Sequence, residues 1–319
     1  MLLSATTALV KAAARQAAAI TPLGPAVLGD RREPLDGRVV FITGAARGLG
    51  AELARQAHAE GARVALVGRR LEPLQALAAE LGEDRAAAFH ADVTDLDALG
   101  RAADGCAERF GRIDVVVANA GIAPPSDTIL TIDPAAFEHT VDVDLLGQWR
   151  TMRATFPHLV NSRGHILVVA SIYAFFNGAM NASYAASKAG TEQLARAARV
   201  ELAHHGATAG IAYLGFVQTD LAADVFAQQS VAEARQAVPA FLTAPIPVEQ
   251  AAAALLDGIE RRAGRVGAPG WVLPMLAVRG VTTTLIDTVM LNNSRLSAAI
   301  ARAETNKDPE LRPRDLRTP

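Results

Sequence analysis

The sequence predicts a doubly wound parallel α/β sheet in a single domain, with extra segments at both termini. From Gly37 onward, short apolar and β-branched runs alternate with longer stretches of helical periodicity. The short runs are almost wholly apolar, as is typical of parallel strands that helices cover on both faces. Such alternation is typical of doubly wound sheets, which bind ligands beyond the carboxyl ends of their strands.

Six runs are the expected strands: 39–42, 64–67, 87–90, 113–117, 165–169 and 210–214. The expected helices include 49–60, 71–81, 99–110, 134–158 and 184–204.

Segments outside this alternation divide the chain into four parts. Residues 1–36 are an Ala-rich, helical lead with a Pro/Gly/Arg linker, and residues 37–263 are the expected α/β domain. Residues 264–303 form an apolar and helical extension. Residues 304–319 are a charged, Pro-containing tail that we expect to be disordered.

Charge and composition exclude several classes of partner. A formal net charge of -2 gives no reason to expect nucleic acid. The single cysteine, Cys106, excludes an intramolecular disulfide and a cysteine zinc site, and we expect no metal site.

No segment reaches the roughly 18–20 apolar residues of a membrane span. The N-terminus lacks the order of a secretory signal, so we expect a cytoplasmic protein. A peripheral membrane contact around Trp271 remains an alternative.

A glycine-rich turn joins the first expected strand to its helix. Gly44, Gly48 and Gly50 allow the backbone to approach a pyrophosphate, and the helix N-terminus supplies free N–H groups. The sequence therefore predicts dinucleotide binding at this turn, by Thr43, Gly44, Ala46, Arg47, Gly48, Leu49 and Gly50.

The end of the second strand predicts which dinucleotide is bound. An acid there would bind a ribose 2′-hydroxyl, but the sequence reads Gly68-Arg69-Arg70. Two guanidiniums suit a 2′-phosphate, and Arg47 in the turn favours the same choice. We therefore expect NADP(H) rather than NAD(H). The alternative is that these arginines are only solvated.

Tyr184, Lys188 and Ser171 are the candidate reacting residues. Hydride transfer to a ketone creates an alkoxide that needs a proton, so an acid must lie within hydrogen-bonding reach. Tyr184 and Lys188 are four residues apart and share a helix face, where an ammonium lowers the pKa of a phenol. Ser171 ends the fifth strand, where its hydroxyl can hold the carbonyl oxygen.

Over residues 36–262 the chain resembles the short-chain dehydrogenase/reductase family, whose fold is of the Rossmann type. The shared motifs are residues 43–50, Asp92-Val93, Asn119-Ala120-Gly121, Ser171 and Tyr184-x-x-x-Lys188. The resemblance implies that Tyr184 is the proton donor or acceptor, that Lys188 tunes its pKa and binds ribose, and that Ser171 orients substrate. It also implies further cofactor contacts, at Asp92, Val93, Asn119, Ala120, Gly121, Gly215, Val217 and Thr219.

The sequence departs from the family at Asp144, where members usually have Asn. The family Asn supports a water next to the lysine, and we expect Asp144 to keep a catalytic role through its backbone carbonyl. Its charge could shift the pKa of the lysine. The usual Pro-Gly after the sixth strand is Leu214-Gly215, and the glycine-rich ending of many members is missing.

Apolar residues near Ser171 and Tyr184 predict a lipophilic substrate. Tyr173, Phe176 and Met180 lie between these two residues, and Phe226, Val238 and Phe241 follow later. We therefore expect a long-chain, alicyclic or steroid-like ketone or alcohol as substrate. The alternative is that these aromatics are ordinary core.

The predicted function is that of an NADP(H)-dependent carbonyl reductase or alcohol dehydrogenase. One alternative is reduction of a 3-ketoacyl thioester, which would need a basic patch for a carrier protein at the entrance. A non-catalytic scaffold is another, but it would be expected to have lost Ser171, Tyr184 or Lys188. The family generally assembles through its two long helices, so a homodimer or homotetramer is expected.

Overall fold

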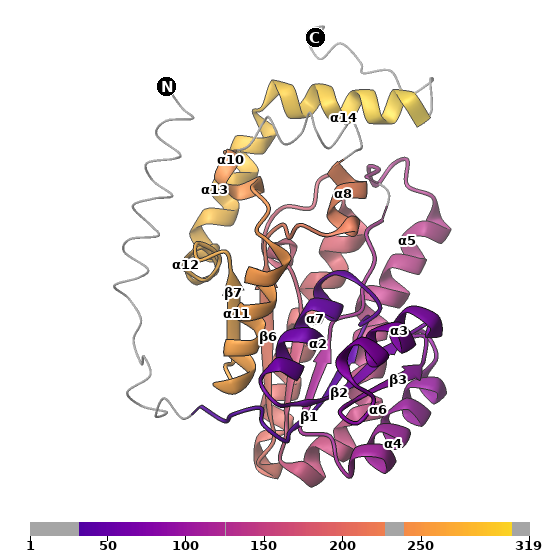
Figure 1. Cartoon of the computed structure of the whole chain (residues 1–319). Helices are drawn as coiled ribbons and strands as arrows, with labels where there is room; N and C mark the ends of the chain where they lie inside the picture. The colour runs from indigo at the N-terminus through magenta and orange to yellow at the C-terminus, as the bar shows by residue number, and fades with distance from the viewer. Residues whose placement is uncertain (1–31, 125, 227–238, 308–319) are drawn as a thin grey trace, which may run out of the picture.

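The computed structural model describes residues 32–124, 126–226 and 239–307. The predicted helical lead at 1–31, the tail at 308–319 and Val238 lie outside the described residues. Seven parallel strands form one sheet in the order β3-β2-β1-β4-β5-β6-β7 (Figure 1). The doubly wound α/β prediction is therefore confirmed.

The strands are β1 (Val39–Thr43), β2 (Arg63–Gly68), β3 (Ala86–His90), β4 (Val115–Ala118), β5 (His165–Val169), β6 (Thr208–Leu214) and β7 (Arg265–Ala268). The helices of the α/β layers are α2 (Gly48–Ala59), α3 (Leu71–Leu81), α4 (Leu96–Phe110), α5 (Pro134–Val141), α6 (Gly147–Ser162), α7 (Ala182–Glu201) and α11 (Val248–Glu260). The remaining helices are α8 (Asp220–Phe226), α10 (Ala240–Thr243), α12 (Val272–Ala277), α13 (Arg279–Leu291) and α14 (Ser294–Lys307).

The sheet separates two hydrophobic cores because successive side chains of a strand point to opposite faces. Val39 and Phe41 belong to the core with side chains of α4, α6 and α7. Val40 and Ile42 belong to the core with side chains of α2, α3 and α11. Every residue of β1 is buried, which explains why its sequence is continuously apolar up to Thr43.

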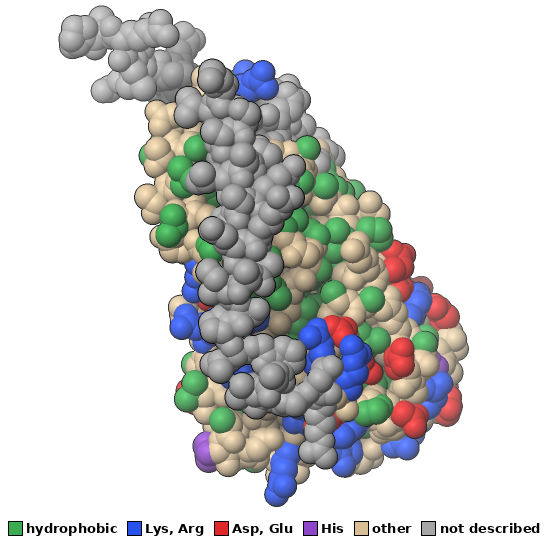
Figure 2. Space-filling view, turned by 90° about the vertical axis from the view of Figure 1, so that its left-hand side faces the viewer, with side chains coloured by type: hydrophobic (Ala, Val, Ile, Leu, Met, Phe, Trp, Pro, Cys, Tyr) green, Lys and Arg blue, Asp and Glu red, His purple; other side chains and the backbone are tan. Residues whose placement is uncertain are grey.

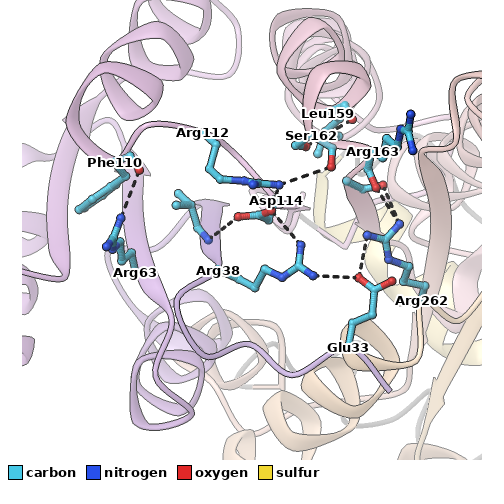
Figure 3. A network of polar contacts seen from close by, with 12 residues as sticks. Glu33, Arg38, Arg63, Phe110, Arg112, Asp114, Leu159, Ser162, Arg163 and Arg262 are labelled. Carbon is cyan, nitrogen blue, oxygen red and sulfur yellow. Dashed lines mark hydrogen bonds and ion pairs between the residues drawn. The ribbon is translucent and has the colours of Figure 1, made fainter. Parts of the chain in front are cut away.

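An ion-pair network fixes the amino ends of the strands, opposite the carboxyl ends where ligands are expected (Figure 3). Asp114, only 2% exposed, accepts from the Val39 N–H at 3.0 Å and pairs with Arg38 and Arg112. Glu33 pairs with Arg38 at 3.5 Å and with Arg262 at 2.8 Å. The segment before β1 is thereby tied to β4 and to the chain after α11.

The sheet extends beyond residue 263, where the sequence analysis ended it. The strand β7 pairs in parallel with β6, from Ile211 opposite Arg265 to Leu214 opposite Ala268. The sequence Arg265-Val266-Gly267-Ala268 contains only one β-branched residue, so it lacked the apolar run that marked the other strands.

The predicted helix 134–158 is interrupted and ends later than expected. A π-helical turn, Asp142–Leu146, lies between α5 and α6, and α6 continues to Ser162. Such turns are rare and occur frequently at functional sites. This one places Asp144 inside the molecule, with its side chain fully buried.

Polar contacts attach the C-terminal helices to the α/β domain. Arg279 of α13 binds both carboxylate oxygens of Glu192 on α7, at 2.7 and 2.8 Å. Asp287 accepts from the Asn177 amide at 2.9 Å. Lys307 at the end of α14 pairs with Asp127 at 3.2 Å. Residues 304–307 therefore belong to a helix, although the sequence analysis placed them in a disordered tail.

The face seen from the side of α12 and α13 is unevenly charged (Figure 2). Hydrophobic and uncharged side chains fill much of its upper part, and most of the charged side chains in view lie lower down. Within the described residues, no helix combines the length and the apolar character needed to cross a membrane.

Candidate active site

The candidate site lies where the strand order reverses. The chain crosses from β3 at the sheet edge back to β4 beside β1, which opens a crevice at the carboxyl ends of these two strands. A cavity of 760 Å³ occupies this position. Its walls come from the segments that follow β1, β2, β3, β4, β5 and β6 and from the start of α7.

The glycine turn forms a close-fitting backbone cradle at one end of the cavity. Gly44 has a φ of +69°, and a Cβ there would lie 2.9 Å from the Ala120 Cα. A Cβ on Gly50 would overlap the Gly44 carbonyl oxygen. The N-terminus of α2, with its free N–H groups, begins within this turn at Gly48. These features fit a dinucleotide pyrophosphate.

The predicted turn residues Gly44, Ala46, Arg47, Gly48, Leu49 and Gly50 line the cavity, but Thr43 does not. Thr43 is 1% exposed, and its hydroxyl accepts from the backbone N–H groups of Asn119 and Ala120, at 3.0 and 3.2 Å. Its own carbonyl accepts from the Asn119 amide at 2.9 Å. Thr43 therefore joins the ends of β1 and β4 beneath the cavity.

Three arginines lie at the rim of the cavity, at the end formed by the glycine turn. Arg47, Arg69 and Arg70 line the cavity and are exposed. The Arg69 Nε lies 3.7 Å from a carboxylate oxygen of Asp92, and Arg47 lies 3.5 Å from Asp220. Both pairs are solvent-accessible, so they hold the guanidiniums only weakly. Asp92 and Val93, predicted from the family resemblance, line the cavity beside them.

The segment after β4 is held from below by two buried side chains. Asn119, Ala120 and Gly121 line the cavity as expected. The Gln148 amide donates to the Ala120 carbonyl at 2.7 Å, and the Asp144 carboxylate accepts from the Ile122 N–H at 2.8 Å. Sequence reasoning missed Gln148, whose only signal is a polar residue on the buried face of α6.

The three candidate reacting residues converge at the other end of the cavity. Ser171 follows β5, is 7% exposed and donates to the Leu214 carbonyl at 3.4 Å. Tyr184 and Lys188 share a face of α7, with the Lys188 ammonium 5.2 Å from the centre of the Tyr184 ring. Lys188 is 4% exposed and donates to the Val169 carbonyl at 3.4 Å. All three line the cavity.

The surroundings of Tyr184 act on its pKa in opposite directions. Burial raises the pKa of Tyr184, the Lys188 ammonium lowers it, and the Asp144 carboxylate raises it again. The nearby Ser171 hydroxyl also lowers the pKa of Tyr184. The balance keeps the pKa of Tyr184 above its ordinary value. Asp144 does not line the cavity itself, and its backbone carbonyl accepts from the Thr191 hydroxyl at 3.0 Å.

A row of aromatic rings extends from Tyr184 along the cavity. Tyr173 meets Tyr184 edge-on at 5.7 Å between ring centres and meets Phe216 at 6.4 Å. Phe216 in turn contacts Phe226 at 5.0 Å. Gly215, Val217 and Thr219, which the resemblance implies as cofactor contacts, also line the cavity.

Phe176 and Met180 were predicted to contact substrate, but neither lines the cavity. Phe176 packs on Phe175 at 4.9 Å and on Trp271 at 6.1 Å between ring centres. Met180 is 7% exposed in the core. Trp271 lies between Phe176 and Phe241 with its indole nitrogen buried.

Several lining residues were not singled out from the sequence. Asn181 brings an amide close to Tyr173, and Ile122, Ala123 and Pro124 form an apolar wall. Asn181 lies three residues before Tyr184, which is the sequence signal that could have identified it. The others follow the Asn119-Ala120-Gly121 motif, so they could have been found by continuing along the chain.

Comparison with known proteins agrees with this arrangement. A model described as short chain dehydrogenase matches residues 38–230. A cis-4-hydroxycyclohexanecarboxylate dehydrogenase from Sinomonas cyclohexanicum is 36% identical over 189 residues, covering 58% of this chain and 76% of the relative. An 11-beta-hydroxysteroid dehydrogenase 1A from Arabidopsis thaliana is 32% identical over 248 residues, covering 75% of this chain and 70% of the relative.

A solved structure of similar fold is a 3-ketoacyl-(acyl-carrier-protein) reductase from Brucella melitensis complexed with NADH. It is 26% identical, has a TM-score of 0.65, and the match covers 73% of this chain and 97% of that one. The sheet, the glycine turn and the matched family model lead to the same conclusion: the chain belongs to the short-chain dehydrogenase family.

Proposed function

We propose that this chain is an NADP(H)-dependent oxidoreductase that interconverts a ketone and an alcohol on a lipophilic substrate. One observation carries the proposal. Ser171, Tyr184 and Lys188 meet at one end of the cavity whose other end is the glycine cradle. A dinucleotide held by the cradle would extend toward these three side chains.

The side chains have complementary roles in this reaction. A bound nicotinamide cofactor supplies the hydride for reduction or accepts it in oxidation. Tyr184 donates a proton to the carbonyl oxygen during reduction and takes the hydroxyl proton during oxidation. Lys188 stabilises the phenolate that forms on Tyr184. Ser171 holds the substrate oxygen beside Tyr184.

The preference for NADP(H) rests on Arg47, Arg69 and Arg70 at the cradle end of the cavity. Guanidiniums bind a 2′-phosphate through charge-assisted hydrogen bonds, and Asp92 and Asp220 hold Arg69 and Arg47 only through exposed pairs. A fluorescence titration should show NADPH binding at least about tenfold tighter than NADH, a difference of about 1.4 kcal/mol.

The variant Arg69→Ala/Arg70→Ala should lose this preference by weakening NADPH binding and leaving NADH binding nearly unchanged. Arg101→Ala, on the exposed face of α4, is the matched control. Equal affinity of the wild-type protein for both cofactors would contradict the assignment of NADP(H).

The lipophilic substrate is supported by the aromatic row Tyr184–Tyr173–Phe216 and by the apolar wall at Ile122–Pro124. Among the described lining residues at this end, Lys188 is the one cation, and it is buried. Two relatives are named for a hydroxycyclohexanecarboxylate and a hydroxysteroid, which agrees with an alicyclic substrate.

A panel with NADPH as reductant tests this substrate class. It should contain cyclic and steroid-like ketones, a long-chain ketone, a 3-ketoacyl thioester and a small charged keto acid. We expect turnover of the alicyclic and long-chain ketones. Turnover of the thioester alone would favour the 3-ketoacyl reductase alternative, which the likeness to the Brucella melitensis enzyme supports. Turnover of keto acids alone would rule out the lipophilic class.

A further inference from the structure

A fully buried carboxylate faces the lysine of the candidate site. Asp144 has no exposed surface, and Lys188 is 4% exposed. The Asp144 Oδ2 lies 3.9 Å from the Lys188 Nζ. This oxygen has no hydrogen-bond partner among the described residues, whereas Oδ1 accepts from the Ile122 N–H at 2.8 Å.

The geometry favours the ionised form of Asp144. A proton on Oδ2 would be a donor without an acceptor among the described residues, and a cation faces that oxygen. Burial raises the pKa of Asp144 above its ordinary value, and the Lys188 ammonium, the Ile122 N–H and His139 offset part of that rise. An isolated buried charge is costly, so the carboxylate and the ammonium stabilise each other.

The charged and titratable groups around this pair come from several elements. Lys188 and Tyr184 face it from α7, and His139 acts on Asp144 from α5. Tyr173 contacts the Tyr184 ring, and the nearby Ser171 hydroxyl acts on the pKa of Tyr184. Lys188 is therefore the cation that favours a Tyr184 phenolate, and Asp144 is the anion that opposes it.

We propose that Asp144 is a positioning residue that offsets the charge of Lys188, so that Tyr184 remains a protonated hydrogen-bond donor throughout the neutral pH range. The inference rests on the proposed function, because Tyr184 is the proton donor there. A protonated Tyr184 is the form needed for carbonyl reduction. Alcohol oxidation needs the phenolate, so its rate rises only at alkaline pH.

Asp144→Asn tests the proposal because the amide oxygen can still accept from Ile122 while the charge is lost. The readout is the ultraviolet difference spectrum of tyrosinate during a pH titration, which needs neither cofactor nor substrate. The chain has three tyrosines, and Tyr184→Phe identifies the transition of Tyr184 by its absence. Burial raises the pKa of Tyr173 and brings that of Tyr213 to about 12, so these residues titrate late.

In the wild-type protein the Tyr184 transition should lie above the ordinary tyrosine value of about pH 10. In Asp144→Asn it should move to lower pH by about one unit or more, as expected for loss of a nearby charge in a partly screened site. The pH profiles of kcat/KM for reduction and oxidation should move by the same amount. Asp142→Asn is the matched control, because Asp142 is two residues away and pairs with Arg150 at 2.8 Å.

The proposal would be overturned if the tyrosinate titration curves of the wild-type protein and of a folded Asp144→Asn variant coincided. It would also be overturned by a wild-type Tyr184 transition at or below neutral pH. Asp144→Ser is a second neutral variant, and melting curves establish which variants fold. The wild-type Tyr184 transition needs only Tyr184→Phe for its assignment, so this outcome does not depend on the stability of the Asp144 variants. Failure of the proposed function would be recognised separately, because no ketone of the substrate panel would then turn over, whatever the tyrosinate titration shows.

Discussion

At the scale of single residues, burial determines how each titratable group behaves. Lys188 and Asp144 are charged groups almost without solvent contact, and each is tolerated because the other lies 3.9 Å away. Cys106, fully buried in α4, has its pKa raised to about 12, so its thiol has no reactive role. The arginines at the glycine-turn end of the cavity, by contrast, are exposed, and Arg69 and Arg47 form only solvent-accessible pairs with Asp92 and Asp220.

His165 makes stability depend on pH. It lies in β5, 1% exposed, with its Nδ1 2.9 Å from the Thr208 hydroxyl oxygen. Burial, with Arg262 and Arg199 nearby, lowers its pKa to about 3. The unfolded chain, in which a histidine pKa is about 6.5, binds more protons as the pH falls below that value. The free energy of unfolding therefore decreases as the pH falls from about 6.5 toward about 3.

Thermal melting at about pH 7.5 and about pH 5 checks this dependence. The melting temperature of the wild-type protein should be lower at the acid pH. His165→Gln, which removes the titrating ring, should show a smaller difference between the two conditions. Equal differences in the two proteins would mean that His165 does not carry the effect.

The sequence predicts some site residues well and others poorly, for physical reasons. Glycines of the turn and the Tyr184-x-x-x-Lys188 pair are recognisable because the chemistry requires those residue types at that spacing. Phe176 and Met180 were placed in the site because they lie between Ser171 and Tyr184 in the chain. Met180 is buried instead, Phe176 is partly buried against Phe175 and Trp271, and no periodic pattern in an irregular loop reveals which side chains point inward.

At the scale of elements, the π-helical turn Asp142–Leu146 connects the fold to the site. It directs Asp144 toward Lys188 and Ile122, and α6, which follows it, supplies Gln148 to the Ala120 carbonyl. The turn was predicted as ordinary helix because its sequence, DVDLL, gives no sign of the extra residue. The strand β7 was missed for lack of an apolar run, whereas α3 was predicted with its observed bounds.

The contact between α13 and α7 predicts how firmly the C-terminal helices are attached. Glu192 is buried at 3% exposure, and Arg279 binds both of its oxygens. Removing the arginine leaves a buried carboxylate without its main partner, which we expect to cost about 1–2 kcal/mol after allowance for the partial exposure of Arg279. Arg279→Met should therefore lower the free energy of unfolding in denaturant titrations.

A double-mutant cycle separates the ion pair from the packing of the arginine stem. Arg279→Met/Glu192→Gln should recover part of the loss, because the uncompensated charge is gone. If the double variant is as unstable as the sum of the two single variants, the two side chains do not stabilise each other.

At the scale of the whole molecule, the sheet brings residues more than a hundred positions apart into one cavity. Gly44 and Ser171 both line it because β1, β4 and β5 are neighbours in the sheet. This topology could be predicted from the rhythm of strands and helices. The attachment of α13 and α14 could not, because it includes ion pairs between residues such as Arg279 and Glu192, 87 positions apart.

Exposed apolar side chains at the start of α6 predict self-association. Leu146 and Trp149, 41% and 43% exposed, are three residues apart and share a helix face. We expect a dimer or tetramer in which this face is covered. Light scattering after gel filtration should give a smaller mass for Trp149→Glu than for the wild-type protein. A monomeric wild-type protein would contradict the expectation.

The most direct test of the account compares NADPH consumption by wild-type protein and Tyr184→Phe, with a ketone that the wild type accepts. The phenylalanine keeps the ring that Lys188 faces and removes only the hydroxyl. The account predicts that turnover falls by at least about a hundredfold while both proteins bind NADPH with similar affinity. Turnover retained in Tyr184→Phe would show that the proton comes from another group and would contradict the assignment of this cavity's chemistry.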